Sequence, residues 1–237
     1  LNQSPRGAPL SDSLFAILKI LFSEKEAGLV AQLPIKPFTV DRAAAIWKLD
    51  KATAQNMLED LAGRAMLLDM EQNGQQMFCL PPPMAGFFEF SMMRVRGDVN
   101  QKALAELYYQ YLNVEEDFVK ALFVENGTPL GRIFVQEAAL PQDGKLEVLD
   151  YERASHIIKT ASHIGVSMCY CRHKMQHLGR ACDAPMDICM TFNTSARSLI
   201  KYGHARQVDA AECLDLLAVA QGHNLVQFGE NAREGVN

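Results

Sequence analysis

Residues 66–80 read MLLDMEQNGQQMFCL, and this stretch decides the fold expected for the N-terminal third of the chain. Asn73-Gly74 is a strong signal for a two-residue hairpin turn. Residues on both sides of it are rich in apolar and extended-chain formers, so the sequence predicts strands over 66–70 and 75–80. The stretch therefore predicts a β-hairpin.

Helical patterns precede this hairpin. Apolar residues recur at helical spacing over 12–23 and over 51–64, and a shorter helix is expected from Thr39 or Asp41 to Trp47. Helices followed by a hairpin are the order of a winged helix-turn-helix. We therefore predict such a domain at the N-terminus.

Pro81-Pro82-Pro83 is the clearest boundary in the sequence. We predict a winged-helix domain over 1–80, a helical middle region over 81–150 and a four-cysteine module over 151–237. The expected fold class is α+β and mostly helical, with a Cys-rich α+β module at the C-terminal end. Further helices are predicted over 84–95, 99–125 (with a break near Asn113-Val114), 151–164, 194–202 and 210–221, and a strand over 132–136.

The composition fits a globular chain. Of 237 residues, 49% are hydrophobic and 22% are charged, which is enough to build a core. The net charge of −5 gives no basic excess of the kind that marks a nucleic-acid binder. No apolar run approaches the roughly 18 residues that span a bilayer. We expect a cytoplasmic protein without a membrane partner.

Four cysteines, Cys169, Cys171, Cys182 and Cys189, follow the spacing C-x-C-x10-C-x6-C. Thiolates this crowded repel each other unless a cation binds them, so the spacing indicates a metal site, most economically an iron–sulfur cluster. If 169–171 is extended, Cys169 and Cys171 share one face. Gly179 and Pro185 permit tight turns beside Cys182. Arg172 places a cation beside a ligand, where it would raise the reduction potential.

The cysteines allow alternatives to a cluster. Cys79 and Cys213 read as buried free thiols. A disulfide between Cys169 and Cys171 is disfavoured because one residue is too short a link. Zinc is the strongest rival, although neither half of the motif has the common C-x2-C spacing. His173 and His177 could join a mixed zinc site, but we expect them on a solvated helix face.

The motif resembles a family of ferredoxin-type iron–sulfur proteins. The resemblance rests on GVSMCYCRH over 165–173, on Gly179-x-x-Cys182, on Pro185-x-x-x-Cys189 and on Phe192. It extends to Gly203, Arg206 and the helix that opens at Asp209, and loosely to the winged helix. It implies a [4Fe-4S] cluster and electron transfer to an oxidoreductase partner. Family members usually continue into a segment with further cluster cysteines, so we expect a C-terminally shortened fragment.

The sequence contains no nucleophile–base pair and no phosphate-binding glycine loop, so we expect an electron-transfer protein or subunit rather than a stand-alone enzyme. One alternative is a redox- or metal-responsive winged-helix transcription regulator, which would be a homodimer. In that case Gln55 and Asn56 would read DNA bases, although Glu59 and Asp60 on the same helix would repel phosphate. A second alternative is a zinc-stapled protein-interaction scaffold.

Overall fold

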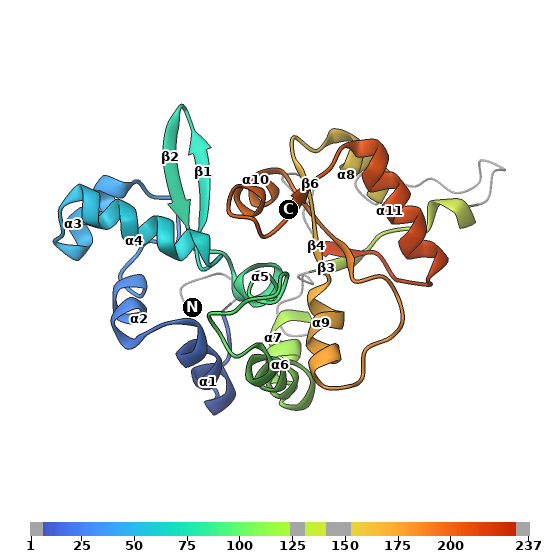
Figure 1. Ribbon diagram of the computed structural model, residues 1–237, viewed down its shortest axis with the longest axis horizontal. Coiled ribbons are helices and arrows are strands. Elements are labelled where there is room, and N and C mark those ends of the chain that lie inside the picture. The colour runs from blue at the N-terminus through green and yellow to red at the C-terminus, as the bar shows by residue number, and fades with distance from the viewer. Residues whose placement is uncertain (1–6, 124–130, 141–152, 231–237) are drawn as a thin grey trace.

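The computed structural model describes residues 7–123, 131–140 and 153–230, and all structural statements below concern them. The fold is α+β and mostly helical, as predicted, and the sheets within the described ranges are small (Figure 1). None of the helices in these ranges has both the length and the apolar character needed to cross a bilayer.

Capped helices build the N-terminal part of the fold. Ser11, Thr39 and Asp50 each accept a hydrogen bond from a backbone N–H in the first turn of the helix that follows. The second helix was not predicted because it buries none of its residues and so has no apolar stripe, but Ser23 and Glu26 form a capping box at its start. The bounds are α1 Asp12–Leu21, α2 Glu24–Val30, α3 Val40–Trp47 and α4 Lys51–Gly63.

The predicted hairpin is confirmed as β1 (Leu68–Gln72) and β2 (Gln75–Cys79), which pair antiparallel. Asn73 and Gly74 have φ values of 53° and 74°, which is the left-handed geometry of the favoured hairpin turn. The first strand begins later than predicted because the chain turns at Ala65, where φ is 59°. A bridge between Phe38 and Phe78 ties the hairpin to the entrance of α3.

Gly74 provides a test of this turn. Gly74→Ala should lower the free energy of unfolding by about 1–2 kcal/mol because an alanine Cβ is strained at positive φ. Gly28, inside α2, has open space where an alanine Cβ would lie, so Gly28→Ala should instead raise stability by about 0.5–1 kcal/mol. Urea denaturation measures both. Equal effects of the two substitutions would contradict the assigned turn.

The middle of the chain is helical but more broken than predicted. Helix is found at the start of the predicted 84–95 segment but ends at Phe90. The predicted 99–125 helix is interrupted at Glu116, where φ is 58°, shortly after the expected break. The elements are η1 Pro83–Phe87, α5 Phe88–Phe90, α6 Gln101–Tyr109, η2 Gln110–Val114, α7 Asp117–Phe123, β3 Gly131–Ile133 and η3 Glu137–Ala139, where η1 and η2 are π-helical and η3 is a 3₁₀ turn.

The C-terminal part holds a three-stranded antiparallel sheet with the order β5-β4-β6. Helices predicted over 151–164, 194–202 and 210–221 are present within similar bounds, and residues 151–152 lie outside the described residues. The helix face expected to carry His173 and His177 is present as α9, for which no bounds were predicted. The elements are α8 Ala154–Thr160, β4 Ile164–Met168, α9 Tyr170–His177, β5 Asp187–Phe192, α10 Asn193–Lys201, β6 Arg206–Gln207, α11 Ala210–Gly222 and β7 Phe228–Glu230, which pairs with β3.

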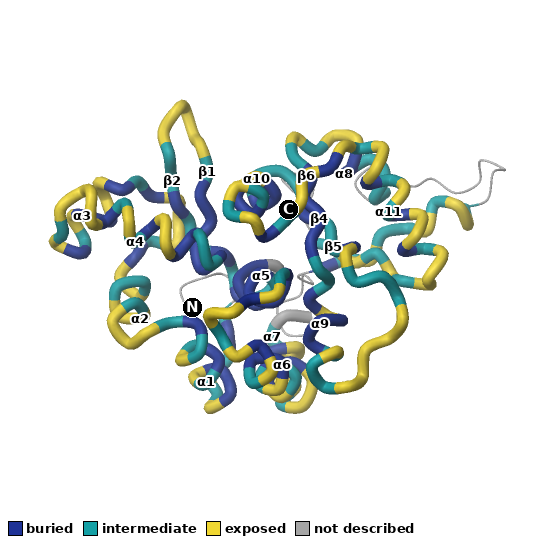
Figure 2. Tube along the Cα trace, viewed as in Figure 1, coloured by how far each residue is buried: buried dark blue, intermediate teal, exposed yellow. Residues whose placement is uncertain are grey.

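Two hydrophobic cores stabilise these elements (Figure 2). The larger core runs from Ala8 to Phe118 and takes in Tyr170 and Leu199 from the C-terminal part. The smaller one lies between α8, α11 and the three-stranded sheet. The larger core thus crosses the triple proline, and it places α9 against α6. The division at residues 80 and 150 stays a prediction.

Candidate metal centre

The cysteine motif begins where β4 passes into α9. The sheet register shifts between Ser167 and Met168, and the N–H of Cys169 donates to the Met186 carbonyl oxygen at 2.7 Å. Cys169 is the N-cap of α9 and Cys171 lies in its first turn. The expectation that 169–171 is extended was therefore wrong. The helix forms because its buried side packs against α6, and that burial includes the ring of Tyr170.

Cys169, Cys171 and Cys189 gather at this helix start; we call them the three-thiol group. The Cys171 thiol hydrogen-bonds to Cys169, which lowers the pKa of Cys169 and raises the pKa of Cys171. Cys189 lies on β5 opposite Ser167. Burial raises the pKa of Cys189 to about 12, and the charge of Cys169 adds a smaller increase. Cys169 therefore influences the ionisation of both other thiols, and Cys189 that of Cys171.

Backbone N–H groups also point toward these sulfurs. Those of Arg172 and Cys171 contribute to the lowered pKa of Cys169, although neither closes a formal capping hydrogen bond. The N–H of Tyr170 acts in the same sense on Cys189. The start of a helix carries partial positive charge, so this position favours thiolates.

Arg172 lies beside the thiols, as predicted from its position next to Cys171 in the sequence. Its charge opposes protonation of Cys169 and Cys189. The guanidinium is buried and donates to the Pro185 carbonyl oxygen, while its Nε has no hydrogen-bond partner. Buried N–H groups are usually hydrogen-bonded, and this one has no acceptor among the described residues.

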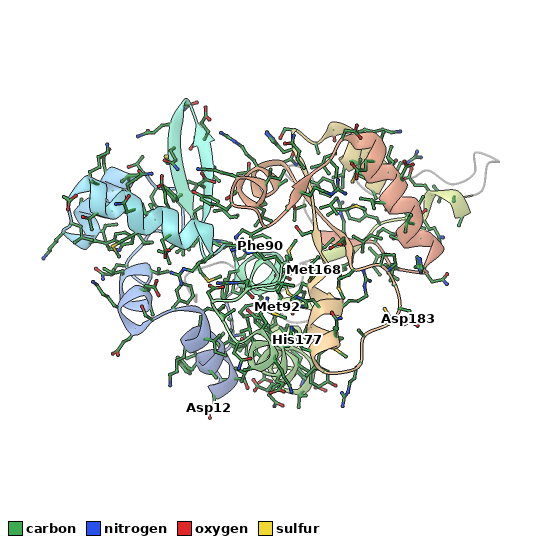
Figure 3. All side chains as sticks on the ribbon, viewed as in Figure 1. Asp12, Phe90, Met92, Met168, His177 and Asp183 are labelled. Atoms are coloured by element: carbon green, nitrogen blue, oxygen red, sulfur yellow. The ribbon has the colours of Figure 1, made fainter. Side chains whose placement is uncertain are left out.

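Cys182 stands apart from the three-thiol group. It is exposed on the loop over 178–186 that joins α9 to β5. Gly179, with φ of 67°, turns the chain into this loop, and Arg180 holds it to α6 by donating to the Tyr109 hydroxyl at 3.1 Å. Figure 3 labels Asp183 at the outer edge of the same loop. The structure therefore brings three of the four predicted ligands together and leaves the fourth on a neighbouring segment.

Two charged residues near the thiols were missed from the sequence. Glu89 on α5 raises the pKa of both Cys171 and Cys189, although the neighbouring thiols and desolvation have larger effects on each. Its signal was available, because it is the one acid in the apolar run 84–93. Lys174 is buried one turn beyond Cys171, donates to Asn113 at 2.9 Å and lies 5.5 Å above the Tyr170 ring centre.

The histidine pair differs from its expected place. His173 and His177 do share a helical face, but His173 is buried and His177 is half-buried, so the face is not solvated. The helix packs this side against α6.

Neither a disulfide nor a ready single-ion site is seen in the part of the chain that the structure describes. All six cysteines are free thiols. Within the described ranges, no three histidine, cysteine or acidic side chains are placed to hold one metal ion. Comparison with models of protein families, with curated proteins and with solved structures found no match.

The ionisation of the thiols can be measured in metal-free protein. Because the pKa of Cys169 is lowered, its thiolate forms at a lower pH than that of an ordinary cysteine, about 8.5. Burial raises the pKa of Cys79 to about 11, so its thiolate forms at a higher pH. Iodoacetamide labelling read by peptide mass spectrometry should modify Cys169 at neutral pH well before Cys79. Labelling of both at the same pH would contradict the arrangement.

Proposed function

We propose that Cys169, Cys171, Cys182 and Cys189 bind an iron–sulfur cluster of the four-iron type, and that the protein passes electrons to or from an oxidoreductase partner. The observation that carries this proposal is the three-thiol group beside a buried arginine, Arg172, whose Nε has no acceptor among the described residues. A cluster held by thiolates is anionic and offers sulfur atoms as acceptors.

The donor chemistry of the site fits such a group. Thiolates are the usual ligands of iron–sulfur clusters. The Arg172 guanidinium and the N–H groups at the start of α9 would stabilise the negative charge of a thiolate-bound cluster. Lys174 adds a second buried cation one turn away. Together these groups would offset the burial of several thiolates.

We prefer a cluster to a single zinc ion because neither half of the cysteine motif has the C-x2-C spacing common in zinc sites. Zinc requires four ligands in a tetrahedron, each thiolate about 2.3 Å from the same ion. The described residues contain no such convergence, even of three ligands. A four-iron cluster instead gives each thiolate its own iron, so Cys169 and Cys171, which hydrogen-bond to each other here, would move apart to bind it. Cys182 would complete the set by inward movement of the loop over 178–186.

When bound, the cluster would supply reversible one-electron transfer. The chain's own residues would set its potential: Arg172 and Lys174 favour the more negative, reduced state, and Glu89 opposes it. Cys171 and Cys182 are exposed, which leaves the site open to close approach by a redox partner.

We infer that residues 12–80 form a winged helix used for protein contact. Support comes from the succession of α3, α4 and the β1–β2 hairpin, joined by the Phe38–Phe78 bridge. On α4, Gln55 donates to Glu59 and to Gln76, so one of the two candidate base-reading side chains is already hydrogen-bonded within the protein. The resemblance of the cysteine motif to ferredoxin-type proteins supports an oxidoreductase as the partner.

Anaerobic reconstitution with ferrous iron and sulfide tests this function. The protein should gain a broad visible absorption that bleaches with dithionite and returns when a one-electron acceptor is added. Uptake of iron and sulfide without reversible reduction would support the cluster but contradict the electron-transfer role. We do not expect the protein to bind a DNA duplex. Salt-dependent binding to one would instead support the alternative of a winged-helix transcription regulator.

A further inference from the structure

His173 and His177 bring two ring nitrogens together beside the cysteine motif without using any cysteine. Their Nε2 atoms lie 3.2 Å apart and their ring centres 4.8 Å apart. The Nδ1 of His173 lies 2.7 Å from the Met92 carbonyl oxygen. Figure 3 labels both His177, the last residue of α9, and Met92.

The Met92 contact fixes the tautomer of His173. A carbonyl oxygen can only accept, so Nδ1 carries the proton and donates it. In the neutral ring Nε2 is then an acceptor, and at 3.2 Å it accepts a hydrogen bond from the Nε2–H of His177; a metal ion between the two nitrogens would take the place of that proton. Histidines that bind metals almost always donate their other ring N–H to a carbonyl or carboxylate in this way. His173 therefore has the hydrogen bonding of a metal ligand.

The spacing of the two nitrogens suits a common ion. Imidazole nitrogens bind zinc at about 2.0–2.1 Å, so a separation of 3.2 Å corresponds to an N–metal–N angle of about 100–106°. This angle lies close to the tetrahedral value. His177 is also in the last turn of α9, where the partial negative charge of the helix end favours a cation.

We propose that His173 and His177 chelate a divalent transition-metal ion of the class that prefers imidazole, with zinc as its representative. Two protein nitrogens hold the ion, and water fills the positions on the half-exposed side of His177. The neighbouring cation Lys102 opposes binding, and two ligands alone make this a readily exchanging site. The site is separate from the cysteines, so it stands whether or not they bind a cluster.

Zinc titration of the full chain, followed by ¹⁵N NMR of the six histidine rings, tests the site. Once the thiols are saturated, added zinc should shift the Nε2 signals of His173 and His177 together. The chemical shifts of the ring nitrogens report imidazole coordination directly, so they distinguish zinc bound to histidine from zinc bound to cysteine.

Matched variants decide the assignment. His177→Ala should weaken the response of His173 to zinc at least about tenfold, whereas His223→Ala, at an exposed position after α11, should leave it unchanged. His177→Gln, which keeps a polar side chain, serves as a second variant if the first unfolds. The proposal is overturned if zinc shifts neither nitrogen in the unaltered protein, or if the His173 response survives both His177 substitutions.

Discussion

Cys171→Ala is expected to reduce the iron and sulfide retained after anaerobic reconstitution at least about tenfold. Cys171 belongs to the three-thiol group and lies in the first turn of α9. On the proposed ligand set, its removal would take away one of four thiolates and leave one iron without its protein ligand. Iron and sulfide analysis with a visible spectrum measures the loss. Because Cys171 is exposed, its removal should leave the fold intact.

Cys79→Ala is the matched control. Cys79 is also a free thiol but lies on β2, away from the motif. We expect this variant to load as the unaltered chain does, and equal loading of Cys171→Ala and Cys79→Ala would contradict the ligand assignment. Cys182→Ala addresses the loop separately. If it loads fully, the loop over 178–186 does not supply the fourth ligand.

Phe88→Ala is expected to lower the free energy of unfolding by about 3–5 kcal/mol. Phe88 is fully buried in the larger core. Its ring contacts those of Tyr108, Tyr111 and Phe118, with centres 5.0, 6.0 and 5.7 Å away. Truncation removes these contacts and leaves a cavity among rigid aromatic neighbours, which cannot collapse to fill it. Urea denaturation measures the difference.

Phe15→Ala is the control for this prediction. Phe15 is also a phenylalanine but is 49% exposed on α1. Its replacement should change stability by about 0.5 kcal/mol or less, as is usual for surface positions. A loss at Phe88 no greater than that at Phe15 would show that the aromatic cluster does not hold the middle region together.

Local sequence signals predicted the elements that depend on local causes. α4 follows from its cap at Asp50 and its apolar stripe, and the hairpin from Asn73-Gly74. The π-helical turns of η1 and η2 left no such signal, because their residues differ little from those of an ordinary helix.

Helix α9, expected only as a solvated face carrying His173 and His177, shows where local reasoning ends. Its residues, YCRHKMQH, are mostly polar and give no apolar stripe. Contact with α6 and α5 stabilises it and buries Arg172, His173 and Lys174, which no pattern along the sequence could predict. The same long-range packing separates Cys182 from the other ligands and brings Glu89 toward them.

The candidate ligands could be proposed from the sequence because four thiols crowded together need a cation. Their geometry could not, since it depends on the antiparallel pairing of β4 with β5, which sets Cys189 opposite Ser167. Arg172 was predicted to lie beside a ligand from its place next to Cys171. Its unpartnered Nε could be seen only in three dimensions.

Metal analysis of the anaerobically purified protein tests the iron–sulfur proposal most directly. We predict a coloured protein with iron and acid-labile sulfide in equal amounts, about four of each per chain, bound through the cysteines over 169–189. A colourless, iron-free protein that carries one zinc ion per chain and unfolds with a chelator would contradict the proposal and support the zinc-stapled scaffold.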